Sequence, residues 1–172
     1  MDTVSFIRRL GTLILLVFIQ VLLLNRIALF GYATPLFYIW MIVRFDSTMK
    51  RSSVLLWAFF LGLTIDMFSS TPGLNAASAT LLAMFQPGIV KLFVPIERHD
   101  QLLPCSAAMG SRQFAGYLLL LTILHHTVYF ILRSIPLADW TVLVLKVVFS
   151  ALLTFIIMFV IEYISISKAP KR

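Results

Sequence analysis

Long apolar runs interrupted by few charged residues dominate this sequence of 172 residues. An α-helix rises about 1.5 Å per residue, so roughly 20 apolar residues cross a hydrocarbon core of about 30 Å. Hydrophobic residues make up 60% of the chain and charged residues only 12%, which leaves too little polar surface for a water-soluble domain. The sequence therefore predicts an integral membrane protein rather than a soluble, disordered or coiled-coil chain.

The apolar runs predict an all-α bundle of about six transmembrane helices that forms a single domain. Transmembrane β-strands would alternate apolar and polar residues in pieces of about ten, and no such alternation occurs. The expected spans cover residues 10–30, 33–49, 53–69, 74–94, 113–133 and 139–164. The second span is short if it begins at Pro35.

The basic residues predict the orientation of the bundle. Lys and Arg in short loops of membrane proteins collect on the cytoplasmic side. If the N-terminus is inside, all but three of the 14 Lys and Arg residues lie in cytoplasmic segments; the exceptions are Arg26, Arg133 and Lys146. We therefore expect both termini to be cytoplasmic. The net charge of +7 then reflects orientation and requires no nucleic-acid partner.

Asp66 is a carboxylate within the third apolar run, close to its end. Such a group usually has a reason to be there, because burying it in a membrane costs free energy. Gly62 lies one turn earlier on the same face, so a neighbouring helix could approach and supply a donor. Asp66 is then either a structural hydrogen-bond acceptor or cap, which we favour, or a proton or ion site.

The segment that follows Asp66 predicts a helical hairpin. Pro72 fixes one φ angle, and Gly73 accepts the left-handed conformation that reverses the chain. Asn75 is placed to cap the fourth helix. Small residues at three- and four-residue steps then form a stripe that lets helices pack closely in lipid: Ala76, Ala79 and Ala83, with Gln86 in line.

The last two spans each carry a polar face. In the fifth span these residues are Thr122, His126, Tyr129 and Arg133, and in the sixth they are Lys146, Ser150 and Thr154. Such faces turn toward other helices or a partner, or they line a cavity. The long side chains of Arg133 and Lys146 could also reach the membrane interface.

The sequence predicts no enzyme, cofactor or metal site. No nucleophile elbow, zinc-protease motif or phosphate loop occurs, and no span carries a close pair of carboxylates. His125 and His126 are adjacent and therefore lie about 100° apart on a helix, so they cannot grip one metal as an i, i+4 pair does.

The order of several short motifs resembles the bacterial rod shape-determining protein MreD family. The resemblance rests on Arg44-Phe45-Asp46, on the Gly62 to Asp66 end of the third span, and on the turn Thr71-Pro72-Gly73 with Asn75. Asn25-Arg26, the Pro35 to Tyr38 stretch and the His125-His126 pair add to it. The resemblance covers nearly the whole chain and is strongest over 44–96.

This resemblance implies a non-catalytic subunit of the cell-elongation complex in the bacterial inner membrane. Its implied partners are MreC, and directly or indirectly RodA, a penicillin-binding transpeptidase and MreB filaments, within membrane lipid. Together with the polar face of the fifth span, it gives these candidates for structural or partner contacts: Asn25, Arg26, Pro35, Gly62, Asp66, Pro72, Gly73, Asn75, His126 and Arg133. It also implies a fold similar to the substrate-binding subunit of energy-coupling-factor transporters.

That similarity supplies the alternative function, a membrane subunit that binds a small solute. The polar faces of the fifth and sixth spans would line its cavity, through Thr122, His126, Tyr129, Lys146, Ser150 and Thr154.

Overall fold

A computed structural model describes residues 3–26, 33–46, 48–95, 103–134 and 139–167. Within these ranges the chain is helical and forms no β-strand. The long helices are α1 (Thr3–Phe18), α3 (Arg51–Ser69), α4 (Leu74–Phe93), α6 (Ser111–Ser134) and α7 (Trp140–Ser167). Helix α1 continues through a π-helical turn, η1 (Ile19–Leu23), and a 3₁₀ turn, η2 (Leu24–Arg26). Short pieces complete the set: η3 (Phe37–Ile39), α2 (Trp40–Val43) and α5 (Ser106–Met109).

Five of the helices are long and apolar enough to cross a membrane. They run over Thr3–Arg26, Arg51–Ser69, Leu74–Phe93, Ser111–Ser134 and Trp140–Ser165. These helices match five of the six predicted spans and indicate a multi-pass membrane protein.

The second predicted span, 33–49, is not one long helix. Its helical part consists of η3 and α2, which together cover only Phe37–Val43. Pro35 explains where this helix begins, because proline lacks an N–H and holds the preceding residue in an extended conformation. A piece of seven residues rises only about 10 Å, too little to cross a bilayer as a helix.

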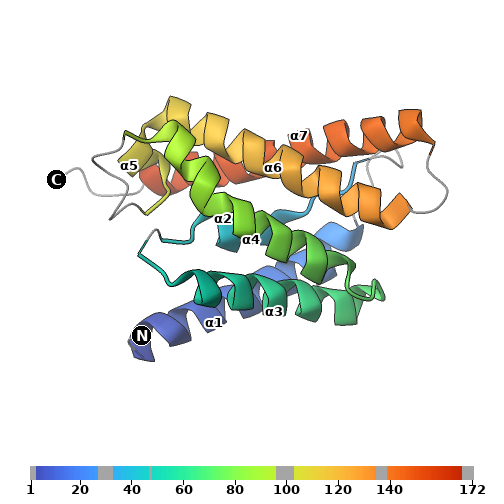
Figure 1. Cartoon of the computed structure of the whole chain (residues 1–172), viewed down its shortest axis with the longest axis horizontal. Coiled ribbons are helices and arrows are strands. Elements are labelled where there is room, and N and C mark those ends of the chain that lie inside the picture. The colour runs from blue at the N-terminus through green and yellow to red at the C-terminus, as the bar shows by residue number, and fades with distance from the viewer. Residues whose placement is uncertain (1–2, 27–32, 47, 96–102, 135–138, 168–172) are drawn as a thin grey trace.

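The long helices lie side by side, and the start of α1 and the end of α7 are at the same end of the bundle (Figure 1). The rings of Phe6 and Trp57 meet near the starts of α1 and α3, with centroids 5.4 Å apart. Asn25 Nδ2 donates to Ser69 Oγ at the other ends of these helices, at 2.8 Å. We call the end with Thr3 and Ser167 the terminal end, and the end with the turn at 70–73 the hairpin end.

Residues 33–45 run through the middle of the bundle, and we call them the interior segment. Thr34 and Leu36 hydrogen-bond to Ser150 and Thr154 of α7, and Arg44 pairs with Glu162 further along the same helix. The interior segment therefore runs parallel to α7, from the hairpin end toward the terminal end.

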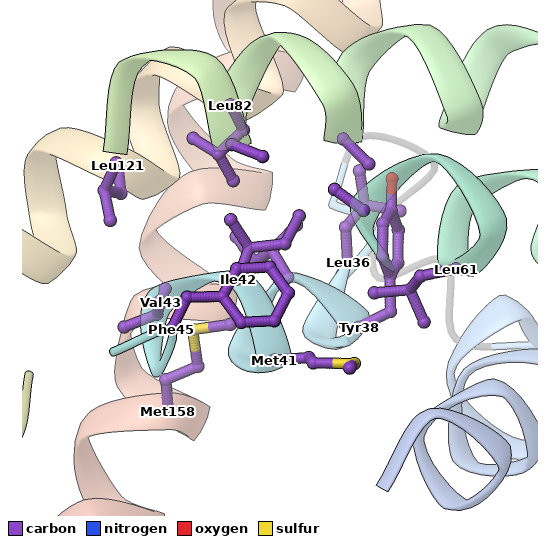
Figure 2. Packing of buried hydrophobic residues seen from close by; sticks show 14 of the residues in the cluster. Leu36, Tyr38, Met41, Ile42, Val43, Phe45, Leu61, Leu82, Leu121 and Met158 are labelled. Carbon is purple, nitrogen blue, oxygen red and sulfur yellow. The ribbon is translucent and has the colours of Figure 1, made fainter. Parts of the chain in front are cut away.

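The interior segment supplies the centre of the hydrophobic core. Tyr38, Ile39, Ile42 and Val43 are completely buried. Leu61 of α3, Leu82 of α4, Leu121 of α6 and Met158 of α7 surround the segment (Figure 2). A short element thus touches helices on all sides, whereas each long helix keeps one face exposed.

Helices α3 and α4 pack closely because α3 carries Gly62 at their contact. A Cβ built on Gly62 would lie 2.5 Å from the carbonyl oxygen of Asn75 and 2.6 Å from Cα of Ala76. Both atoms belong to the backbone of α4, so no side-chain rotation could relieve the overlap.

We predict that Gly62→Ala destabilises the bundle, because the added methyl group forces α3 away from α4. Overpacking of this kind costs about 1–3 kcal/mol. Thermal unfolding in mild detergent measures the effect. Gly88→Ala is the matched control, since a Cβ there meets nothing within 4 Å. Equal melting temperatures for the two variants would contradict the close contact.

Candidate functional site

The interior segment presents backbone groups that no regular helix satisfies. Non-helical backbone at membrane depth is tolerated only where protein or trapped water supplies hydrogen-bond partners. Each buried N–H or C=O left unpaired would cost about 1–3 kcal/mol. The surrounding helices provide these partners through side chains, and we call this set the polar framework.

At the hairpin end, side chains from two helices bind the first residues of the interior segment. Gln20 of η1 is completely buried; its Oε1 accepts from Phe37 N at 2.8 Å, and its Nε2 donates to the Pro35 carbonyl at 3.0 Å. From α7, Ser150 Oγ accepts from Thr34 N at 2.9 Å, and Thr154 Oγ1 accepts from Leu36 N at 3.1 Å. Gln20 thus acts as the N-cap that the short helix lacks locally.

At the terminal end, Tyr117 and Gln86 bind the last carbonyl groups of the interior segment. The Tyr117 hydroxyl donates to the Val43 carbonyl at 2.9 Å, and Gln86 Nε2 donates to the Phe45 carbonyl at 3.3 Å. Gln86 also donates to the Tyr117 hydroxyl at 2.9 Å. Helices α4 and α6 are therefore joined through the end of the segment.

Glu162 anchors the same end from α7. Its carboxylate is buried and lies 2.6 Å from Arg44 Nη1, and its other oxygen accepts from Ser106 N at 2.8 Å. The Arg44 guanidinium also lies over the Trp40 ring, 5.5 Å from its centroid. Both oxygens of the buried carboxylate are thereby paired, which is the condition for keeping such a group away from water.

Asp66 caps helix α4 from the end of α3. Its Oδ1 accepts from Thr71 Oγ1 at 2.8 Å and from the backbone N and Nδ2 of Asn75, each at 2.9 Å. Its Oδ2 accepts from Ala76 N at 2.9 Å. A carboxylate at a helix N-terminus satisfies backbone N–H groups and complements the helix dipole.

The expectation that Asn75 is the N-cap of α4 is wrong, because α4 begins at Leu74, one residue before Asn75. Gly73 occupies the N-cap position with φ of 75°, and Asn75 lies inside the first turn. Its side chain donates to Asp66 and Thr71 instead. Gly73 adopts the expected left-handed conformation, and Pro72 lies in the turn before it.

Tyr38 links the hairpin to the interior segment and to α6. Its hydroxyl donates to Asn75 Oδ1 at 3.0 Å and lies 3.0 Å from His125 Nε2. Because the Tyr38 proton goes to Asn75, His125 Nε2 carries the proton of the second bond. Nδ1 of His125 is then a buried acceptor without a partner among the described residues.

His126 and Thr154 form a buried imidazole–hydroxyl pair. His126 Nδ1 lies 2.8 Å from the Thr122 carbonyl, and Nε2 lies 3.1 Å from Thr154 Oγ1. A carbonyl only accepts, so Nδ1 carries the proton and Nε2 accepts from the hydroxyl. Both residues have zero exposure, and Thr154 also holds Leu36. This pair therefore links α6 to α7 and, through Leu36, to the interior segment.

The structure divides the residues expected to line a solute cavity. Thr122, His126, Ser150 and Thr154 are fully buried within the polar framework. Tyr129 and Lys146 instead line an open cavity at the hairpin end, together with Arg26 and Arg133. Two of the six residues thus line this open cavity, and the other four are buried between helices.

Of the other predicted site residues, Asn25 and Pro35 meet through Gln20. Gln20 Nε2 donates both to Asn25 Oδ1 at 2.9 Å and to the Pro35 carbonyl. Within the described residues, no group of three His, Cys, Asp or Glu side chains is arranged to hold a metal ion.

Several residues that hold the polar framework together have no such role predicted from the sequence. Gln20, Tyr117 and Glu162 are not predicted at all; Tyr38 and His125 enter only through the family resemblance, and Gln86 only through a packing stripe. Gln20 and Glu162 carried a usable signal, since each is a polar residue inside a long apolar run. Tyr117 and Tyr38 carried none, because Tyr is also common at membrane interfaces.

No protein-family model, curated protein or solved structure matches this chain. The similarity to the energy-coupling-factor subunit therefore stays a prediction.

We predict that Gln20→Leu destabilises the protein, because it leaves Phe37 N and the Pro35 carbonyl without the partners that Gln20 supplies. The expected loss is about 1–3 kcal/mol for each buried group left unpaired. Thermal unfolding in detergent measures it. Thr80→Val is the control, since the Thr80 hydroxyl bonds only within its own helix, to the Ala76 carbonyl. A melting temperature for Gln20→Leu no lower than that of the control would contradict the capping role.

We predict a graded response at Asp66. Asp66→Leu removes the acceptors of four hydrogen bonds and lowers the yield of monodisperse protein. Asp66→Asn retains a carbonyl oxygen for Thr71 and Asn75 but sets an amide against Ala76 N, so its yield falls between wild type and Asp66→Leu. Size-exclusion chromatography provides the readout, and full yield from Asp66→Leu would exclude a structural role.

Proposed function

We propose that this protein is a non-catalytic membrane scaffold of the bacterial cell-elongation complex. In this proposal it binds MreC and helps to position peptidoglycan synthesis, which controls cell shape. The observation that carries the proposal is the agreement between the MreD-like motif and the polar framework. Gly62, Asp66 and Asn75 of that motif join α3 to α4, and Tyr38 extends the connection to the interior segment.

A rigid scaffold accounts for how the buried polar side chains are used. Gln20, Asp66, Gln86 and Thr154 bind backbone groups of other segments. Tyr117 does the same on α6. Polar groups used in this way fix one arrangement of helices, as a scaffold requires.

A groove on the outer face of α3 and α4 suits a partner's transmembrane helix. It has a volume of about 460 Å³ and an almost wholly apolar lining. Gly73, Ala76, Ala77 and Thr80 line its α4 side. Small residues let helix backbones approach closely in lipid, where association depends on packing. We therefore assign this groove to the single span of MreC.

The proposal places the protein in the bacterial inner membrane with both termini in the cytoplasm. Most of the described basic residues lie toward the terminal end, in keeping with the positive-inside rule; they are Arg8, Arg9, Arg44, Lys50, Arg51, Lys91 and Arg112. RodA, the penicillin-binding transpeptidase and MreB filaments would then connect to this subunit directly or through MreC.

Co-expression with MreC tests the scaffold. We expect MreC to co-purify with the tagged protein in mild detergent, and depletion of the protein to widen cells. Failure to co-purify, together with normal cell width after depletion, would reject the proposal.

Ala77→Phe tests the groove itself. Ala77 is exposed, so the variant should fold, but the ring would fill the groove and reduce recovered MreC severalfold. Val144→Phe is the control, since Val144 is exposed on α7 outside the groove. Equal recovery of MreC with both variants would move the interface to another face.

A further inference from the structure

A cavity at the hairpin end gathers the three basic residues that the positive-inside rule leaves unexplained. It has a volume of about 560 Å³, and Arg26, Arg133 and Lys146 all line it. They come from η2, α6 and α7, which are far apart in sequence. Snorkelling to an interface would not require three helices to direct their cations to one place.

The two carboxylates near this end hydrogen-bond to neutral N–H and O–H groups rather than to the three cations. Asp66 is occupied by the hairpin hydrogen bonds, and Asp139 Oδ1 accepts from Thr141 N at 2.9 Å at the start of α7. The only ion pair among the described residues joins Arg44 to Glu162 near the terminal end. The sequence has no acidic residue at 27–32 or 135–138, which adjoin the cavity-lining elements. Among the described residues, neither carboxylate forms an ion pair with the three cations, and the three positive charges at this end exceed the two negative ones.

An apolar groove leads away from this cavity between α1 and α3. The groove has a volume of about 220 Å³ and an entirely apolar lining surface. Val21, Leu22 and Phe68 line both the groove and the cavity. The only hydroxyl in the lining belongs to Thr64 and is bonded to the Phe60 carbonyl at 2.7 Å. The cationic cavity and the apolar groove thus adjoin each other, and they share three lining residues.

We propose that the hairpin end binds one anionic lipid, with its phosphate group among Arg26, Arg133 and Lys146 and its hydrocarbon chain along the α1–α3 groove. Arg and Lys are the usual partners of phosphate, Arg through paired N–H donors. The groove selects an amphiphile over a small anion, because a free anion would gain nothing from it. A peptide strand in the groove would leave its backbone N–H and C=O groups unpaired.

The test compares ligands on the purified full-length protein in nonionic detergent. Phosphatidylglycerol should bind at least about tenfold more tightly than phosphatidylcholine, and inorganic pyrophosphate should bind weakly, as measured by native mass spectrometry and titration. A hexaglutamate peptide serves as the acidic-peptide probe and should not compete with the lipid.

Two variants test the binding of the lipid headgroup and of its hydrocarbon chain separately. Removing all three cations in the variant R26Q/R133Q/K146Q should abolish the preference for phosphatidylglycerol. The charge-matched control, K50Q/K91Q/R112Q, alters exposed cations outside the cavity and should keep it. Ile14→Trp fills the groove from an exposed position that does not line the cavity, and it should weaken lipid binding while leaving pyrophosphate binding unchanged.

Three results would overturn the proposal. They are equal binding of the two lipids, pyrophosphate binding as tight as phosphatidylglycerol, or competition by hexaglutamate without lipid selectivity. If the triple variant fails to fold, the single substitutions Lys146→Gln, in the cavity, and Ile14→Trp, in the groove, test the same two sites. Co-purification with MreC is measured separately, so this proposal and the scaffold can fail independently.

Discussion

The structure depends on one constraint, which is that a broken backbone segment lies within the hydrophobic core of the bundle. Pro35 prevents residues 33–45 from forming one long helix, and lipid supplies no partner for the backbone groups that are left over. Side chains of the surrounding helices must therefore supply them. Gln20 and Thr154 do so at one end, and Tyr117 and Gln86 at the other.

This requirement also explains how so apolar a chain acquires one defined arrangement of helices. Apolar faces slide past one another at little cost in lipid, because lipid tails are as apolar as leucine. Hydrogen bonds to the interior segment fix the positions of surrounding helices along the bundle axis. The Asp66 cap fixes the α3–α4 hairpin, and Tyr38 ties that hairpin to the centre through Asn75. These polar residues thus have a structural role, in which they fix the helices relative to one another.

The five long helices could be predicted from the lengths of the apolar runs, since length and hydropathy decide whether a helix spans a bilayer. The predicted 53–69 and 74–94 correspond to Arg51–Ser69 and Leu74–Phe93. The interior segment could not be predicted, because hydropathy treats a residue buried in protein and one facing lipid alike. The roles of Gln20 and Glu162 depend on partners distant in sequence, Phe37 and Ser106, which spacing does not reveal.

Hydrogen–deuterium exchange on the reconstituted protein tests this account most directly. If side chains hold the backbone of the interior segment, amides at 36–45 exchange as slowly as those at 117–126 in α6, although their helix is far shorter. Exchange at 36–45 as fast as at the exposed start of α1 would contradict the account, because it would show that these backbone groups are not held by the surrounding helices.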